Sequence, residues 1–584
     1  MQQIGGFAKD FLTLLDQGWP AIALPSAFDP PTDARKRELW ERCLLVCADY
    51  FGTTSNEYRL LEKGIAVHHS SMPKLLTRLL IETMQEGLIW IVLATSTLSE
   101  GVNIPVETIL VPSLLRGGRP VNTSEFRNLA GRAGRPGVAT EGRTLILLRP
   151  LNAPDDSSKA RYNTLRQQLT QATVAAVPQS PLSAVITDIW TQWQFITGTS
   201  DAEAFFVWLE TVVWSDLPPE QLSSLGGLDA LDGVLLASLV EHEELRGLSD
   251  WEAAVQDLWR ATFSSNSAPP LNKEAFTRRG KAIPRIYADQ ASRRRLYHTG
   301  LPLATAAELL AAMASIRVVL AAGTPYATWN SAERMAYIVT VVDALATVRR
   351  FRPPDPANIW QTRLRWWLRI PGATQPVVRE IAEWHKYITQ QFQYRFCWGL
   401  GSVIGVAFDE VHEGELQATT LADWEQTSLP WIVFWLKELI AWGTHDPPAA
   451  FLLGRGLART RAEAETLSAP YYASPFASAV TDPLDPRAIR DWATATFPNL
   501  QEPESAALVS QHPATIVDQS ILAHGQDLRV LPVRENGGVG WFDIAGYRLA
   551  RSPNLEWQWE PTAIRLTDFI LRPTQGVVDF QTYL

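Results

Sequence analysis

The first 150 residues alternate between the two hydrophobic periodicities that distinguish helices from strands. Apolar residues recur at helical spacing over residues 7–15 and 35–50, and again over a segment that Pro73 opens and that runs to about residue 86. Short apolar runs between these helices are typical of buried strands, and they lie at residues 64–68, 89–94, 108–111 and 144–148. Strands that alternate with helices predict a doubly wound α/β layer with a parallel sheet.

Beyond residue 150 the pattern changes to long amphipathic stretches. Helical spacing with Pro and Gly breaks continues to about residue 460, which predicts an all-helical region of one or two subdomains. A stretch rich in Pro, Ser and Ala is typical of a linker, and short apolar runs with a Gly-rich turn at 536–540 favour a small α+β C-terminal module. The predicted divisions are residues 1–155, 156–465, 466–487 and 488–584, the last of unknown role.

Composition narrows the possible functions. The 584 residues carry 52 Lys+Arg against 62 Asp+Glu, a net charge of -10, so any nucleic-acid site must be local. Three cysteines exclude a disulfide framework and a four-cysteine zinc site, and we predict no metal site; Cys43 and Cys47, one helical turn apart, predict buried packing. Without a signal peptide or an unbroken apolar run of membrane-spanning length, the sequence predicts a cytoplasmic protein with no membrane partner.

Two segments carry the candidate chemistry. Residues 93–105, Leu-Ala-Thr-Ser-Thr-Leu-Ser-Glu-Gly-Val-Asn-Ile-Pro, leave a predicted strand at the carboxyl edge of the sheet, the usual ligand edge in parallel sheets. Residues 125–137, Glu-Phe-Arg-Asn-Leu-Ala-Gly-Arg-Ala-Gly-Arg-Pro-Gly, contain Arg132 and Arg135, which project from one face if they lie on a helix. Paired arginines can neutralise the charge that develops on a transferring phosphoryl group.

These segments resemble motifs V and VI of the superfamily-two DEAD/DEAH-box helicases, in particular the branch of repair and RNA-exosome helicases. Residues 64–70, Gly-Ile-Ala-Val-His-His-Ser, followed by Pro73, are similar to the stretch ahead of motif V, so order and spacing agree over about ninety residues. The resemblance implies a RecA-like second helicase domain, followed by helices in the position of the relatives' winged-helix and ratchet domains. The alternative is an ordinary α/β domain whose arginines form salt bridges in solvent.

The resemblance also implies roles for single residues. Arg132 and Arg135 would face the γ-phosphate of ATP as catalytic arginine fingers, with Gly101 and Asn103 near the nucleotide. Contacts with the nucleic-acid backbone would come from His69, Thr95, Ser96 and Thr97. The string Arg116-Gly-Gly-Arg119 has a good two-residue hairpin turn where relatives place a strand-separating hairpin, although a plain surface loop fits the string equally well.

Parts of a complete motor are missing from the sequence. No Gly-x-x-x-x-Gly-Lys-Ser/Thr string occurs, so ATP and Mg²⁺ would be bound mainly by a first RecA-like domain elsewhere. Residues 406–412, Val-Ala-Phe-Asp-Glu-Val-His, imitate a strand with a DExH box but follow motif VI, and we interpret them as a coincidence within a helix or loop. Relatives carry an apolar strand just before the helix that begins here near Phe7. Either the true N-terminus lies upstream, or a partner chain supplies that strand together with the Walker A and DExH motifs.

Two Arg-rich segments could either contact nucleic acid or form a solvated charged face. Residues 273–295 hold eight cations against two anions, and residues 349–369 hold six against one, interleaved with Trp360, Trp366 and Trp367. Such segments suit backbone contact with base stacking, or else form a solvated charged face whose tryptophans pack inward.

The leading hypothesis is the C-terminal half of an ATP-dependent helicase or translocase acting on DNA or RNA, an enzyme only when joined to its first RecA-like domain. The alternative is a non-catalytic nucleic-acid-binding or scaffold protein that kept the fold.

Overall fold

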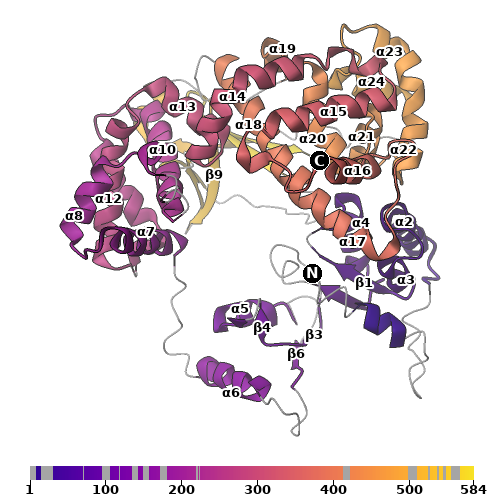
Figure 1. The fold of residues 1–584 in the computed structure, drawn as a ribbon, viewed down its shortest axis with the longest axis horizontal. Coiled ribbons are helices and arrows are strands. Elements are labelled where there is room, and N and C mark those ends of the chain that lie inside the picture. The colour runs from indigo at the N-terminus through magenta and orange to yellow at the C-terminus, as the bar shows by residue number, and fades with distance from the viewer. Residues whose placement is uncertain are drawn as a thin grey trace.

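The computed structural model describes most of the chain, in segments separated by gaps: residues 8–14, 30–69, 71–94, 106–116, 119–133, 142–148, 157–170, 180–218, 221, 224–266, 268–411, 421–497, 510–523, 527–535, 538–543, 547–553 and 566–583. The described residues are mostly helical. In Figure 1 the N-terminal α/β segments lie below an arc of helices, and a C-terminal sheet lies behind that arc.

The N-terminal α/β segments contain short strands between helices, as the sequence pattern predicts. Residues 8–14 are helical. The elements that follow are α2 (Ala34–Phe51), α3 (Asn56–Leu61), β1 (Ile65–His68), α4 (Lys74–Gln85), β2 (Ile91–Ala94), β3 (Thr108–Val111), β4 (Leu115–Arg116), β5 (Arg119–Pro120), α5 (Thr123–Ala130), β6 (Arg143–Ile146) and α6 (Ser157–Thr170). Cys43 and Cys47 are buried in α2 among apolar side chains, which confirms their predicted packing role.

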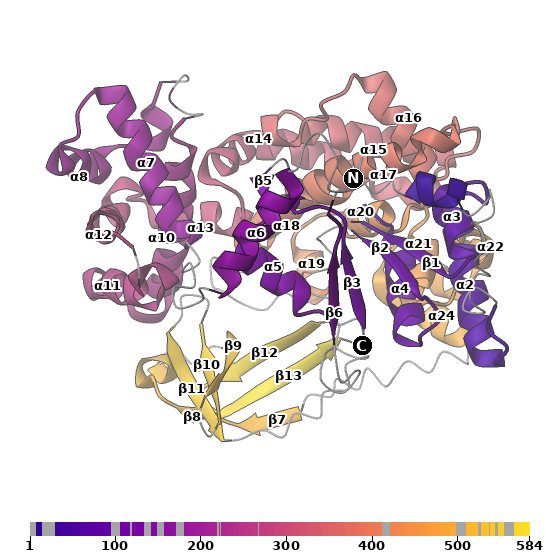
Figure 2. The same ribbon diagram turned by 90° about the horizontal axis from the view of Figure 1, so that it is seen from below.

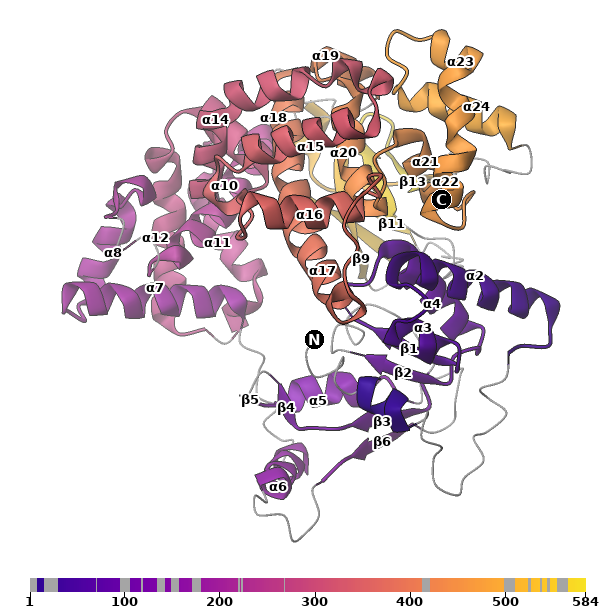
Figure 3. The ribbon, with the colours of Figure 1, turned by 45° about the vertical axis from the view of Figure 1, so that its right-hand side comes forward.

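The parallel strands form two separate pairs instead of the predicted continuous sheet. β1 pairs with β2 in the register Ile65↔Ile91 to His68↔Ala94, and β3 pairs with β6 in the register Thr108↔Arg143 to Val111↔Ile146. Figures 2 and 3 show the two pairs as distinct units. Among the described residues no strand connects β2 to β3, so the described strands form two sheets of two strands each.

The helical part has two hydrophobic cores. The first lies among α7 (Pro181–Thr197), α8 (Ala202–Thr211), α10 (Gly226–Arg246), α11 (Trp251–Ala261), α12 (Pro270–Ile286) and α13 (Gln290–Thr299). The second, larger core lies among α14 (Leu303–Ala321), α15 (Ser331–Leu345), α16 (Ala357–Trp367), α17 (Ile381–Tyr387), the π-helix Ile388–Phe396, α18 (Cys397–Val411), α19 (Leu421–Gln426), α20 (Trp431–Trp442), α21 (Pro447–Arg455), α22 (Arg461–Ser468), α23 (Pro475–Ser478) and α24 (Pro486–Thr496).

The helical segment Leu303–Thr328 is long and apolar enough to cross a membrane by length and composition, contrary to the expectation that no such run exists. It is the one segment of this kind within the described ranges. Leu309, Ile316 and Leu320 are fully buried in the larger core, and Arg317 pairs with Glu410 at 2.7 Å between Nη1 and Oε2. Core packing therefore accounts for the apolar residues at these three positions.

The segment 466–487 is folded, and its interpretation as a linker is wrong. Tyr471 and Leu484 are fully buried in the larger core, and the Trp435 indole donates to the Leu484 carbonyl at 2.7 Å. Pro470, Pro475 and Pro486 stand in the first turns of helices, where a missing N–H costs nothing. Ser474 and Asp485 cap the helices that begin at Pro475 and Pro486. Pro and Ser are common both in linkers and at the N-termini of helices, so composition alone does not distinguish the two.

The C-terminal module is a seven-stranded antiparallel sheet and not the predicted α+β unit. Its order is β7-β13-β12-β9-β10-β11-β8, with α24 belonging instead to the helical core. The strands are β7 (Ser510–Pro513), β8 (Thr515–Ile516), β9 (Leu528–Glu535), β10 (Gly538–Phe542), β11 (Arg548–Pro553), β12 (Leu566–Arg572) and β13 (Val577–Tyr583). The sheet contacts α10, where Arg246 pairs with Asp518 and lies 4.4 Å from the Tyr547 ring centroid.

Helix α2 is bound tightly to the helical part (Figure 3). The Tyr50 hydroxyl donates to the Trp442 carbonyl at 3.1 Å, and Arg461 Nε donates to Asp49 Oδ2 at 2.9 Å. His385 is fully enclosed beside them, with Nε2 3.0 Å from the Tyr50 carbonyl oxygen. One half of the α/β segment therefore shares its core with helices that follow it by more than 300 residues.

We expect this junction to weaken in acid. Burial lowers the pKa of His385 to about 3 from its ordinary 6.5, so the folded state keeps the ring neutral while the unfolded chain protonates it below about pH 6.5. The stability that His385 contributes is present above that pH and is lost as pH falls toward 3. The free energy of unfolding should therefore fall between pH 7.5 and 5.0, and fall less in His385→Phe. An equal pH dependence in both proteins would contradict this assignment.

Candidate nucleotide and nucleic-acid site

Helix α5 begins at a capping box that the local sequence encodes. Asn122 Oδ1 accepts the Glu125 N–H at 2.8 Å, and Glu125 Oε2 accepts the Asn122 N–H at 3.2 Å. Phe126, on the buried face of the helix, packs with Val111 of β3 and with Leu165 of α6. The capping box fixes where the helix starts, and Phe126 fixes which face it turns to the strands. Sequence reasoning passed over this Asn-x-x-Glu signal.

Arg132 lies beyond the end of α5, which corrects the expectation that it projects from a helix. The helix ends at Ala130, and the Arg132 N–H donates to the Leu129 carbonyl at 3.2 Å in a turn. Ala133 forms a parallel bridge with Val106, the residue directly after the 93–105 segment. The structure thus places Val106 beside the turn that holds the half-buried Arg132.

We expect the capping box to control the order of this turn. Replacing Asn122 with alanine removes the acceptor for the Glu125 N–H and should cost about 1 kcal/mol of local stability. Amide exchange in α5 should then quicken by roughly fivefold, while Ser124→Ala, an exposed neighbour without the capping bond, should leave it unchanged. Hydrogen–deuterium exchange of peptides over residues 123–133 measures both variants. Equal exchange in the two would show that the capping box does not hold the helix.

The carboxyl end of β1 carries His69 next to the start of the predicted backbone-contacting loop. His68 pairs in register with Ala94, the residue directly before Thr95. His69 is 6% exposed, and its Nδ1 accepts the Ser71 N–H at 3.3 Å, so Nε2 carries the ring proton. Burial, and then the neighbouring His68, lower its pKa to about 4. His69 is therefore a neutral hydrogen-bond donor, and its contact with nucleic acid stays a prediction.

A hairpin exists at the position predicted from the Gly-Gly turn. β4 and β5 pair antiparallel, with Arg116 opposite Arg119, and the Val121 N–H extends the ladder to the Leu114 carbonyl at 3.0 Å. The hairpin thus places Arg116 and Arg119 at paired positions, and their contact with nucleic acid stays a prediction.

The remaining predicted site residues lie outside the described part of the chain. They are Arg135, Gly101, Asn103, Thr95, Ser96 and Thr97.

The Arg-rich segments are used largely for internal pairing. Arg278, Arg279, Lys281, Arg293 and Arg294 all form ion pairs with carboxylates of other elements. In the second segment the tryptophans at 360, 366 and 367 are buried, at 3%, 8% and 1% exposure, so they pack inward. The structure thus favours the interpretation of both segments as packing and salt-bridge elements.

Residues 406–411 of the string that imitates a DExH box lie in helix α18, in agreement with the prediction of a coincidence within a helix or loop. Asp409 is buried and pairs with Arg294 at 3.6 Å and with His298 at 3.3 Å. Its carboxylate therefore serves a contact between α18 and α13.

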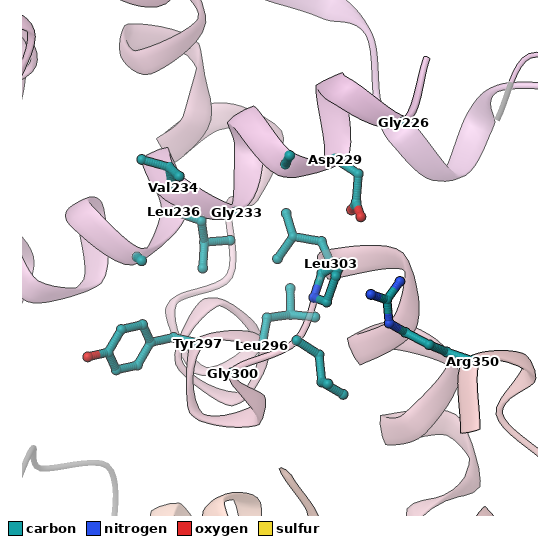
Figure 4. A pocket seen from close by; sticks show the side chains of 14 residues that line it. Gly226, Asp229, Gly233, Val234, Leu236, Leu296, Tyr297, Gly300, Leu303 and Arg350 are labelled. Atoms are coloured by element: carbon teal, nitrogen blue, oxygen red, sulfur yellow. The ribbon is translucent and has the colours of Figure 1, made fainter. Parts of the chain in front are cut away.

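A cavity of about 620 Å³ lies between α10, α13 and the turn at residues 300–303 (Figure 4). Its lining is apolar apart from Asp229, Tyr297 and Arg350. Asp229 accepts the Ala304 N–H at 3.0 Å, and burial raises its pKa. The cavity is separate from the candidate site, because none of its lining residues comes from the motif segments.

Comparison with known proteins gives the site its context. No protein-family model matches the chain. Stretches of it are 37% identical over 101 residues to the ATP-dependent DNA helicase Hel308 of Aeropyrum pernix, 33% over 134 residues to the Hachiman protein HamB of Bacillus cereus, and 35% over 92 residues to the antiviral helicase SKI2 of Saccharomyces cerevisiae.

Each match covers only a short stretch of this chain and of the relative. They cover 17%, 23% and 15% of this chain and 14%, 11% and 7% of the three relatives, so the chain corresponds to a small part of each. A helicase POLQ-like protein of Caenorhabditis elegans is 35% identical over 86 residues, which are 15% of this chain and 9% of that relative. The chain thus contains a superfamily-two helicase-like region, related to the Hel308, Ski2 and polymerase-theta-like helicases.

Proposed function

We propose that this chain is the C-terminal half of an ATP-dependent nucleic-acid helicase or translocase, with residues 1–155 as its second RecA-like domain. The observation that carries the proposal is the bridge between Val106, directly after the first helicase-like segment, and Ala133, within the second; stretches of the chain are also similar to helicases. Arg132 and Arg135 then act as arginine fingers on the γ-phosphate of ATP, and Gly101 and Asn103 lie near the nucleotide.

The first RecA-like domain supplies the phosphate-binding loop and the carboxylates that hold Mg²⁺, from an upstream segment or a partner chain. His69, Thr95, Ser96 and Thr97 contact the nucleic-acid backbone, where hydroxyl and imidazole donors position a strand without reading its sequence. The hairpin of Arg116 and Arg119 is the candidate wedge. DNA and RNA both satisfy this chemistry.

The test measures phosphate release from ATP with and without the missing half. The full chain alone should show no ATPase activity, since its sequence has no phosphate-binding Gly-x-x-x-x-Gly-Lys-Ser/Thr string. Adding the polypeptide that carries the loop should produce activity that single-stranded nucleic acid stimulates. ATP hydrolysis by the chain alone would refute the proposal that an upstream segment or a partner chain supplies the phosphate-binding loop. Nucleic-acid binding without ATPase activity in the combined protein would instead support the scaffold alternative.

A further inference from the structure

The cavity between α10 and α13 has the size of a small-molecule site (Figure 4). Its volume of about 620 Å³ falls within the range of roughly 300–1,000 Å³ that ligand pockets span. All of its lining residues belong to the described part of the chain, and two of them, Asp229 and Arg350, carry charges. The other walls are apolar apart from Tyr297, so the cavity combines an apolar space with a few polar groups.

Small residues on one face of α10 leave the space empty. They follow one another at helical spacing and all line the cavity, namely Gly226, Ala230, Gly233 and Ala237. A Cβ atom built at Gly226 or Gly233 would meet no heavy atom of a neighbouring element within 4 Å. Leu296, Leu301 and Leu303 supply apolar side chains to the same cavity. A ligand with an apolar body would therefore remove apolar surface from water on several sides.

The two charged side chains lie on the same side of the cavity in Figure 4. Asp229 is 8% exposed, and its Oδ1 accepts the Ala304 N–H at 3.0 Å. Burial raises the pKa of Asp229, and the positive charge of Arg350 acts in the opposite direction, so the guanidinium lies near the carboxylate. Neither side chain forms an ion pair with a residue in the described ranges. The cavity thus presents an anionic and a cationic group that do not neutralise each other by direct contact.

Trp398 of α18 holds the cationic side of the cavity in place. The guanidinium carbon of Arg350 lies 5.0 Å from the Trp398 ring centroid. The Trp398 indole also donates to the carbonyl of Gly300, a lining residue at the end of α13, at 3.2 Å. One side chain therefore positions both Arg350 and the turn after α13, which keeps the charged group beside the apolar space.

We propose that this cavity binds a free α-amino acid with a large apolar side chain. The ammonium group of the ligand pairs with Asp229, its carboxylate pairs with Arg350, and its side chain lies against the leucines. A purely anionic head group would add a second negative charge beside Asp229, and a purely cationic one would add a second positive charge beside Arg350. A zwitterionic head group satisfies both through charge-assisted hydrogen bonds, which are stronger than neutral ones.

The cavity shares no lining residue with the helicase-like segments, so its ligand does not depend on the proposed function.

Isothermal titration calorimetry of the full chain with L-leucine, L-phenylalanine and L-tryptophan tests the ligand class. Affinity should rise with the apolar area of the side chain, because a larger side chain fills more of the cavity. Phenylalaninamide lacks the carboxylate and N-acetylphenylalanine lacks the ammonium group, so each should bind about tenfold more weakly than phenylalanine, or weaker still. Absence of saturable binding by all three amino acids would overturn the proposal. Equal affinity for phenylalanine and both derivatives would also overturn it, since the two charged groups would then not recognise the ligand.

Filling the cavity locates the binding site. Gly233→Leu places a side chain in the empty space and should abolish binding of phenylalanine. The midpoint of thermal unfolding should not fall, because a Cβ atom there meets open space and leucine forms helix more readily than glycine. Unchanged phenylalanine binding by a folded Gly233→Leu variant would show that the amino acid binds elsewhere, and the proposal would be wrong.

A second substitution separates the two ends of the head group. Arg350→Gln removes the partner of the ligand carboxylate and should weaken phenylalanine binding about tenfold, while binding of phenylalaninamide should change little. The matched control is Arg352→Gln, which removes an exposed arginine that does not line the cavity and should leave both affinities unchanged. An equal loss of phenylalanine binding in the two variants would reduce the effect of Arg350 to general positive charge and contradict the proposed pairing.

Discussion

Replacing Arg135 with alanine should lower kcat for ATP hydrolysis by about 10³-fold or more in the combined protein, and replacing Arg132 should also impair it. An arginine finger neutralises charge that develops on the γ-phosphate in the transition state, so its loss acts on kcat far more than on ATP binding. Lysine at position 135 should not restore activity, because it lacks the planar, bidentate guanidinium. Steady-state phosphate release at saturating nucleic acid measures each variant.

The matched control is Arg127→Ala, which removes an exposed cation from the last turn of α5, near the turn that holds Arg132. Its activity should equal that of the wild type. A loss shared equally by Arg127→Ala and Arg135→Ala would show that the region needs positive charge in general, and the finger assignment would be wrong. Unchanged kcat in both finger variants would remove the mechanistic part of the proposed function.

The second large effect concerns stability. Arg279→Ala should destabilise the core around α8, α10 and α12 by about 3–5 kcal/mol, because it leaves a buried carboxylate without its partner. Arg279 and Asp232 are both fully buried, with Nε 2.6 Å from Oδ1, and Arg279 Nη1 also donates to the Val212 carbonyl at 2.8 Å. Hydrogen exchange of α10 and α12 amides under native conditions reports the loss.

The adjacent residue provides the control. Arg278 pairs with Glu203, Glu210 and Glu274 at the surface, and Arg278→Ala should cost at most about 1 kcal/mol. The double variant Arg279→Met with Asp232→Leu should recover part of the loss, since neither charge is then buried alone. Equal costs for Arg278→Ala and Arg279→Ala would contradict the buried-pair explanation.

Local patterns predicted the local structure well. The run at 64–68 became Ile65–His68, the segment opened by Pro73 became Lys74–Gln85, and the Gly-Gly turn became a two-stranded hairpin. Each of these features depends on neighbours in sequence. The motif resemblance, which depends on order and spacing, agrees with the helicase relatives.

Predictions failed where distant segments decide the outcome. The proline content of 466–487 predicts a linker, but Tyr471 and Leu484 of this segment are buried in the helical core. That burial depends on helices elsewhere in the sequence. From sequence alone, the cations of 273–295 could bind phosphate. In the structure, several of them pair with carboxylates of elements far away in sequence, such as Asp232 and Asp409. The three-residue spacing of Arg132 and Arg135 suits one face of a helix, whereas α5 ends at Ala130 and Arg132 lies in the turn that follows.

The contact between α2 and the helical part has a consequence for how this protein can be divided. Trp40 and Cys43 on the buried face of α2 lie in one core with α20 and α21, and Arg461 reaches across to Asp49. Helix α6, by contrast, packs on α5 through Leu165. Cutting the chain after residue 155 would therefore separate two parts of one hydrophobic core and expose its apolar side chains. It would also remove the packing partner of α6. The segment that carries the helicase motifs is a unit of sequence, and it is not a unit that can be excised, expressed or exchanged between proteins by itself.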